Sequence, residues 1–151
     1  MTTIAWDGET LAADTKCTDG ESFFGFESKI FESEDGSRAA AATGNSDECT
    51  AFIDWFLAGA DVEKRPLGEN QEFGDDFRGV GVEVSDGAAC CYEYGKLLIA
   101  DEVIYRMAWG SGWQWALAAM DLDHNAVDAV TYAATRDLGT GGSVEQYTPD
   151  I

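Results

Sequence analysis

Four Asp-Gly pairs constrain this chain of 151 residues more than any other feature of its sequence. They lie at Asp7-Gly8, Asp19-Gly20, Asp35-Gly36 and Asp86-Gly87. Asp and Gly both tolerate positive φ, so an Asp-Gly pair between β-prone runs is a strong hairpin signal. Three of the pairs separate such runs, which predicts three hairpins and at least six antiparallel strands. The paired runs are Thr3–Trp6 with Thr10–Ala13, Lys29–Phe31 with Arg38–Ala42, and Val80–Val84 with Ala88–Tyr92.

Apolar residues at helical spacing interrupt the strands in three places. Phe52, Trp55 and Phe56 share one face of the first predicted helix, and Asp123 is expected to cap the third. The order of elements is strands, helix, strands, two helices and a strand, which is typical of an α+β fold. The predicted elements are a helix from Ser46 to about Val62, helices over Trp113–Met120 and Ala126–Ala134, and a last strand over Ser143–Tyr147.

The charge balance of the chain excludes several partners. Asp and Glu number 29 against 9 Lys and Arg, which gives a formal net charge of −20. Nucleic acids and anionic membrane surfaces would repel such a protein. No apolar run approaches the roughly 20 residues of a membrane span, and the first residues lack the apolar core of a signal peptide. We therefore expect a single cytoplasmic domain over residues 1–151, in the host cytoplasm if the chain is phage-encoded.

The cysteines do not form a metal-binding pattern. Cys17, Cys49, Cys90 and Cys91 contain no C-x-x-C spacing, and the chain has one histidine. We expect these cysteines to be buried, reduced and structural, and we expect no metal and no cofactor.

Thr2 is the first candidate for chemistry because it directly follows the initiator methionine. Methionine aminopeptidase normally removes Met1 before a small residue, which would leave threonine at the N-terminus. Such a residue carries a nucleophilic hydroxyl and an α-amine that can accept its proton. The amine has an ordinary pKa of about 7.7–8, which suits a general base. Many proteins begin Met-Thr, so Thr2 alone is weak evidence.

Five further motifs follow in a fixed order and give Thr2 a context. With the opening Thr2-Thr3-Ile4-Ala5, the chain resembles the proteasome β-subunit family, including the bacterial HslV peptidase, within the N-terminal-nucleophile hydrolases. The resemblance covers most of the chain and implies a four-layer αββα sandwich. The motifs are Leu11-Ala12-Ala13-Asp14, Lys29-Ile30, Thr43-Gly44-Asn45-Ser46, Gly110-Ser111-Gly112, and Ala134-Thr135-Arg136-Asp137 with Gly141-Gly142.

The resemblance implies a role for each matched residue. Thr2 is the expected nucleophile, and Asp14 is expected to orient Lys29, whose cation lowers the pKa of the Thr2 amine. The backbone N–H of Gly44 is expected to form the oxyanion hole. Ser111 is expected to lie beside the N-terminal amine, supported by Asp137. The residues alone leave simpler roles open: Ser111 as a helix cap, Lys29 as a surface cation, or Asp137 as a partner of Arg136.

The sequence departs from the family pattern at three places. Thr140 stands where the family usually has a serine before the closing Gly-Gly, and Asn45 replaces the glycine that follows Gly44. The connection Lys64–Phe77 is too short for the long second helix of these subunits, so a compact version of the fold is expected.

The resemblance implies a threonine endopeptidase that hydrolyses peptides or unfolded proteins, with homo-oligomers formed through the helix pair near the C-terminus. The residues give no indication of an ATP-driven unfoldase partner. Two other interpretations stay open. One is a non-catalytic protein of this fold that binds or inhibits a partner through its cleft or a former subunit interface. The other is amide hydrolysis of a small molecule.

Overall fold

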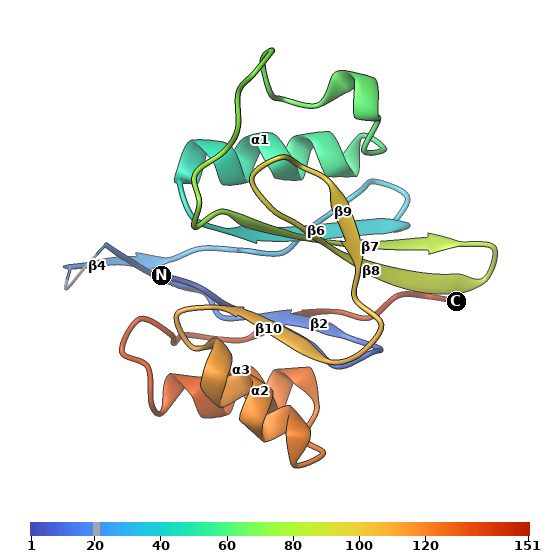
Figure 1. Ribbon diagram of the computed structural model, residues 1–151. Helices are drawn as coiled ribbons and strands as arrows, with labels where there is room; N and C mark the ends of the chain where they lie inside the picture. The colour runs from blue at the N-terminus through green and yellow to red at the C-terminus, as the bar shows by residue number, and fades with distance from the viewer. Residues whose placement is uncertain (20–21) are drawn as a thin grey trace. The chain divides into compact units, whose positions relative to one another are not determined.

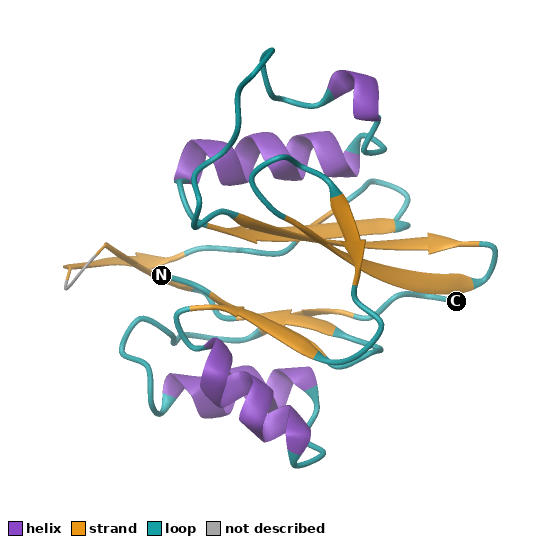
Figure 2. Ribbon diagram, viewed as in Figure 1, coloured by secondary structure: helices purple, strands orange, loops and turns teal. Residues whose placement is uncertain are grey.

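The computed structural model describes residues 1–19 and 22–151. These residues form two compact units, each assembled from separate stretches of chain. The first unit contains 1–30 and 104–148, and the second contains 31–103 and 149–151. Helices and antiparallel strands make up both units, so the predicted α+β class is confirmed (Figure 2).

The first unit contains a four-stranded antiparallel sheet in the order β10-β1-β2-β11. Helices α2 and α3 lie against one face of this sheet (Figure 1). Alanines on the strands let the helices approach closely, and Ala5, Ala12 and Ala108 pack among Ala116, Ala129 and Val130. The strands are β10 Met107–Gly110, β1 Thr3–Trp6, β2 Leu11–Ala13 and β11 Glu145–Tyr147, and the helices are α2 Trp113–Asp121 and α3 Ala126–Ala134.

A two-stranded ribbon in the first unit was not predicted from the sequence. Strand β3, Lys16–Asp19, pairs antiparallel with β4, Ser22–Phe26. Cys17 pairs with Gly25 but Thr18 pairs with Phe23, so Phe24 is an extra residue at a β-bulge. The Asp19-Gly20 turn signal falls partly outside the described residues.

The second unit contains a five-stranded antiparallel sheet in the order β5-β6-β7-β8-β9, with helix α1 against one face (Figure 1). Gly79 and Gly81 on β7 leave room for the helix, because a Cβ at Gly79 would lie 2.7 Å from the Phe52 ring. In the resulting core the Phe52 and Phe56 rings stack, and the Tyr94 ring packs tilted against Phe52 and edge-to-face against Phe56. The elements are β5 Phe31–Glu32, β6 Arg38–Thr43, β7 Arg78–Ser85, β8 Ala88–Tyr94, β9 Ala100–Glu102, α1 Ser46–Leu57 and the 3-10 helix η1 Val62–Lys64.

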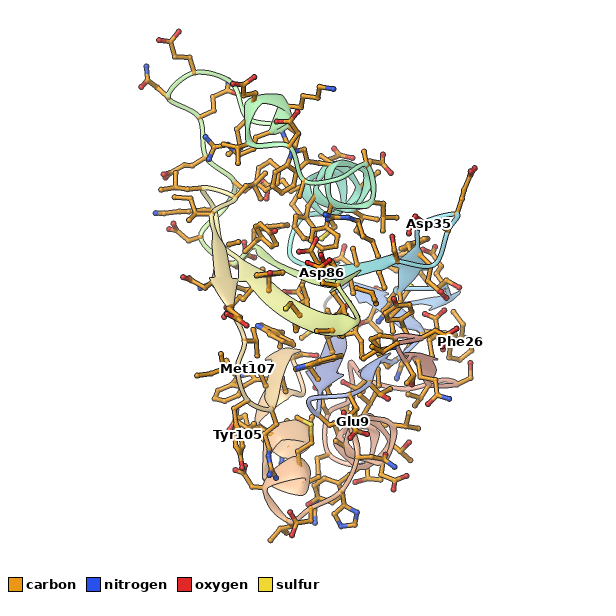
Figure 3. The ribbon with its side chains drawn as sticks, turned by 90° about the vertical axis from the view of Figure 1, so that its right-hand side faces the viewer. Glu9, Phe26, Asp35, Asp86, Tyr105 and Met107 are labelled. Carbon is orange, nitrogen blue, oxygen red and sulfur yellow. The ribbon has the colours of Figure 1, made fainter. Side chains whose placement is uncertain are left out.

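The three predicted hairpins are confirmed, since β1 pairs with β2, β5 with β6, and β7 with β8. Asp35 and Asp86 occupy the turns of the last two hairpins (Figure 3). The first helix ends at Leu57 and not near Val62, because Gly59 and Ala60 both adopt positive φ. The prediction that Asp123 caps the last helix is also wrong. Asn125 caps α3 by accepting a hydrogen bond from the Asp128 N–H.

The connection Lys64–Phe77, predicted to be too short for a long second helix, begins where η1 ends and is irregular over residues 65–77. All four cysteines are free, but only Cys91 is buried, and the other three are partly exposed. Burial raises the pKa of the Cys49 thiol to about 11. In the described part of the chain, no helix is long and apolar enough to cross a bilayer. The described residues also contain no group of three His, Cys, Asp or Glu side chains that could hold a metal ion.

Candidate active site

Thr2 directly precedes Thr3, the first residue of β1, which is an inner strand of the first unit's sheet. The Thr2 carbonyl accepts a hydrogen bond of 2.9 Å from the Ser111 N–H. Gly110 adopts a φ of +94°, and a Cβ there would overlap the Thr2 carbonyl oxygen, so this position requires glycine. The Gly110-Ser111-Gly112 loop therefore presses directly against the backbone of the predicted nucleophile.

Asp14 follows β2 and is completely buried. Its Oδ1 accepts from the Lys29 ammonium at 2.8 Å and from the Thr3 N–H at 3.0 Å. Its Oδ2 accepts from the Gly141 N–H at 3.1 Å. The side chain of Lys29 is 10% exposed and that of Asp14 is 1% exposed, so this is a buried ion pair. Three donors satisfy the carboxylate, as a buried charge requires.

The same ammonium reaches the start of the chain. Lys29 Nζ donates to the Met1 carbonyl oxygen at 2.9 Å and to the Lys16 carbonyl oxygen at 2.6 Å. Because the Met1 carbonyl and the Thr2 nitrogen share one peptide group, the ammonium lies within about 5.5 Å of that nitrogen. The Glu145 carboxylate also holds Lys29 in place, because it accepts a 2.5 Å hydrogen bond from the Lys29 backbone N–H.

Ser111 donates to Asp137 Oδ2 at 2.5 Å, and Thr140 donates to the same oxygen at 2.6 Å. Burial opposes the ionisation of Asp137, but these two hydroxyls and the Gly139 N–H outweigh it and lower the pKa of the carboxyl. The residue that caps α2 is Gly112, so Ser111 is free of that simpler role. Thr140 keeps the hydroxyl contact to Asp137 although it adds a methyl group.

The structure brings five of the six predicted residues into one unit, at or next to the start of β1: Thr2, Asp14, Lys29, Ser111 and Asp137. Gly44 belongs to the second unit, where it follows β6 and precedes Asn45, the N-cap of α1. It adopts a φ of +120°, and a Cβ there would lie 3.1 Å from the Phe77 Cα. Its role in an oxyanion hole stays a prediction.

Sequence reasoning missed Thr3 and Glu145. Both are ordinary strand residues by pattern, and the partners of their side chains lie more than 100 residues away along the chain. No local signal marks them. The position of Thr3, directly after a predicted nucleophile, is the one clue that the sequence offered.

No protein-family model matches this chain, and no curated protein matches it by sequence. Solved structures match its fold. Thiobacillus denitrificans BPH is similar with a TM-score of 0.66 at 21% identity, over 99% of both chains. A complex of the same protein with epoxomicin is similar with a TM-score of 0.66 at 16% identity, also over 99% of both chains. At these identities the similarity shows a shared fold and nothing finer.

Proposed function

We propose that this protein is a threonine peptidase of the N-terminal-nucleophile type, with Thr2 as nucleophile after removal of Met1. One observation carries the proposal. The buried Lys29–Asp14 pair and the Ser111–Asp137 pair both contact the backbone at Thr2 or the residues on either side of it. A buried cation and an ordered hydroxyl beside an N-terminal threonine are the groups that this chemistry needs.

We further propose that the protein is a four-layer αββα sandwich. Each sheet carries buried apolar residues on the face opposite its helices, and such a face needs a second layer to cover it. The residues are Ile4, Trp6, Leu11 and Trp109 in the first unit, and Ala39, Ala41, Val80 and Val82 in the second.

In the proposed reaction, the free α-amine of Thr2 takes the proton of the Thr2 hydroxyl as the oxygen attacks a peptide carbonyl. The Lys29 ammonium lowers the pKa of that amine and favours the attacking alkoxide. With Met1 still attached, the Thr2 nitrogen is an amide that cannot accept the proton. Removal of Met1 therefore switches the chemistry on and releases one acceptor from Lys29.

Attack forms a tetrahedral oxyanion, which the Gly44 N–H would stabilise by about 3–4 kcal/mol. The protonated amine then gives its proton to the leaving nitrogen as the peptide C–N bond breaks, and an ester remains on Thr2. The same amine activates water, which hydrolyses the ester and restores the hydroxyl. Ser111, held by Asp137, orders the hydrogen bonds of the amine through the cycle.

The substrate proposed is a peptide or an unfolded protein, and the proposed setting is the cytoplasm. Exposed apolar residues on the helix pair favour a homo-oligomer. They are Trp113 on α2, Leu122 directly after the end of α2, and Tyr132 on α3. The charge of −20 opposes association at low salt, so assembly should strengthen as salt screens the repulsion.

The function is tested with the full chain, whose intact mass shows whether Met1 has been removed. Where Met1 is retained, the protein is first treated with methionine aminopeptidase. Hydrolysis of a mixed fluorogenic peptide panel and of an unfolded protein is then measured for wild type, Thr2→Ala and Thr2→Ser. We expect activity in the wild type, none in Thr2→Ala and a reduced rate in Thr2→Ser.

Thr2→Ala is a matched control because Met1 is also removed before alanine. Epoxomicin serves as an independent probe, since a protein of the same fold binds it. Covalent addition to wild type but not to Thr2→Ala would support the nucleophile. Equal hydrolysis by wild type and Thr2→Ala would refute the peptidase and favour a non-catalytic binding protein.

A further inference from the structure

Thr3 has a fully buried polar side chain that the proposed mechanism does not use. Its hydroxyl oxygen lies 3.0 Å from the Gly112 N–H and 2.6 Å from the Thr140 hydroxyl oxygen. The space around it is closed, because a Cβ at Gly112 would lie 2.5 Å from the Thr3 oxygen and 3.0 Å from the Thr140 oxygen. The three residues therefore form a tight polar cluster inside the first unit.

Donor counting fixes the direction of these hydrogen bonds. Each threonine hydroxyl carries one hydrogen, and an ionised carboxylate only accepts. Thr140 gives its hydrogen to Asp137 Oδ2, so between the two threonines Thr3 must be the donor. The Gly112 N–H in turn donates to the Thr3 oxygen. The chain of donors runs from Gly112 through Thr3 and Thr140 to Asp137, which also receives the Ser111 hydroxyl.

The backbone of Thr3 reaches the other half of the site. Its N–H donates to Asp14 Oδ1, the same oxygen that receives the Lys29 ammonium. Thr3 thus contacts Asp14 through its main chain, and its side chain is linked to the Ser111–Asp137 pair through Gly112 and Thr140. Thr2 immediately precedes this junction, so any shift of Thr3 moves the nucleophile relative to both pairs.

We propose that Thr3 is a positioning residue for the nucleophile, acting through a buried hydroxyl that locks the Gly110–Gly112 loop and Asp137 to the strand that begins after Thr2. This inference rests on the proposed function. Misplacement of a reacting group by about 1 Å can cost about 100-fold in rate, so loss of this hydroxyl should lower kcat. KM should stay nearly constant, because Thr3 is buried and does not face the substrate.

The test compares Thr3→Val, which keeps the shape but lacks the hydroxyl, with Thr3→Ser, which keeps the hydroxyl. We expect kcat to fall about 10- to 100-fold in Thr3→Val, with KM within about two-fold of wild type. Thr3→Ser should recover most of the lost kcat. Thr10→Val is the matched control, because Thr10 forms a similar 2.7 Å hydroxyl pair with Thr148 at an exposed place in the same unit. Its kinetics should equal those of wild type.

Equal kcat in Thr3→Val and wild type would overturn the inference and leave the peptidase proposal intact. An equal fall of kcat in Thr3→Ser and Thr3→Val would also overturn it, because the hydroxyl would then be irrelevant. If Thr3→Val does not fold, Thr140→Val interrupts the same series of hydrogen bonds between Thr3 and Asp137. It must then lower kcat and leave KM nearly constant.

A second readout does not depend on activity. The carboxyl signal of Asp137 is titrated by NMR in wild type and Thr3→Val, together with exchange of the Gly112 amide. Without the Thr3 hydroxyl, which donates to Thr140, the pKa of Asp137 should rise and the Gly112 amide should exchange faster. If wild type hydrolyses nothing, the peptidase proposal fails, and these two signals alone judge Thr3: both unchanged in Thr3→Val would overturn its role.

Discussion

Asp14→Asn is expected to be among the most destabilising single polar substitutions in this protein. The change leaves the Lys29 ammonium without its anionic partner in a place where its side chain is 10% exposed. It also removes negative charge from a carboxylate that accepts three hydrogen bonds and is 1% exposed. Removing one partner of a buried ion pair costs about 3–5 kcal/mol, because the remaining charge is buried without compensation.

For a chain of this size, that loss corresponds to a fall in Tm of roughly 6–20 °C. Chemical denaturation followed by tryptophan fluorescence measures the free energy of unfolding of the full chain. The control is Asp75→Asn, which removes an ion pair with Lys96 that has similar geometry at 3.0 Å but a 91% exposed carboxylate. Exposed pairs contribute little, so this variant should match wild type.

A double-mutant cycle identifies the cause. Lys29→Met removes the cation, and in the Asp14→Asn, Lys29→Met protein neither charge remains buried. The double variant should be more stable than the sum of the two single changes predicts. If Asp14→Asn and Asp75→Asn lose the same free energy of unfolding, burial of the pair does not matter and the argument is refuted.

Three further predictions concern the second unit and its thiols. Gly81→Ala should cost about 1–3 kcal/mol in unfolding experiments, because its Cβ would overlap the Phe56 ring, whereas Gly95→Ala meets no atom within 4 Å and should be neutral. The Ser37 N–H, the Ser37 hydroxyl and then the Ser33 hydroxyl lower the pKa of Asp35 to about 2. Its contribution to stability is therefore present above about pH 4 and lost as pH falls toward 2, and Asp35→Asn should remove that part of an acid titration. The thiol of Cys49, with its pKa raised to about 11, should react with an alkylating agent at pH 8 far more slowly than free cysteine does. Mass spectrometry follows the reaction.

The fold was predictable where local rules decide it. Asp-Gly turns with flanking strands have their causes within about ten residues, and all three predicted hairpins form. The error at the end of α1 is also local: an apolar pattern that continues to Ala60 hid a chain reversal at Gly59, which adopts a φ of +121°. The ribbon of β3 and β4 was missed because exposed strands without alternating burial carry no periodic signal.

The candidate site was predictable only through the order of its motifs. Composition and spacing could not show that Asp14 and Gly141 touch, since 127 residues separate them. The resemblance named Thr2, Asp14, Lys29 and Ser111 as a set, but it did not reveal that Thr3 bonds to Asp14 and, through Thr140, is linked to Asp137. Such contacts depend on tertiary packing, which a single sequence does not display.

The buried pair also changes what loss of Lys29 should do. The resemblance alone predicts that Lys29→Ala abolishes hydrolysis and leaves the fold intact. Because Lys29 compensates a buried carboxylate, we now expect Lys29→Ala to lose stability as well as activity.

The double variant Asp14→Asn, Lys29→Met separates these two effects. No uncompensated charge is buried in this variant, so it should be more stable than Asp14→Asn. However, no cation remains to lower the pKa of the Thr2 amine. We therefore expect a folded protein whose hydrolysis is reduced on the order of a thousand-fold or more. Activity is measured on the peptide panel at a temperature where denaturation curves show the variant fully folded. Wild-type activity in that folded variant would show that Lys29 serves stability alone, and the proposed activation of Thr2 would have to be abandoned.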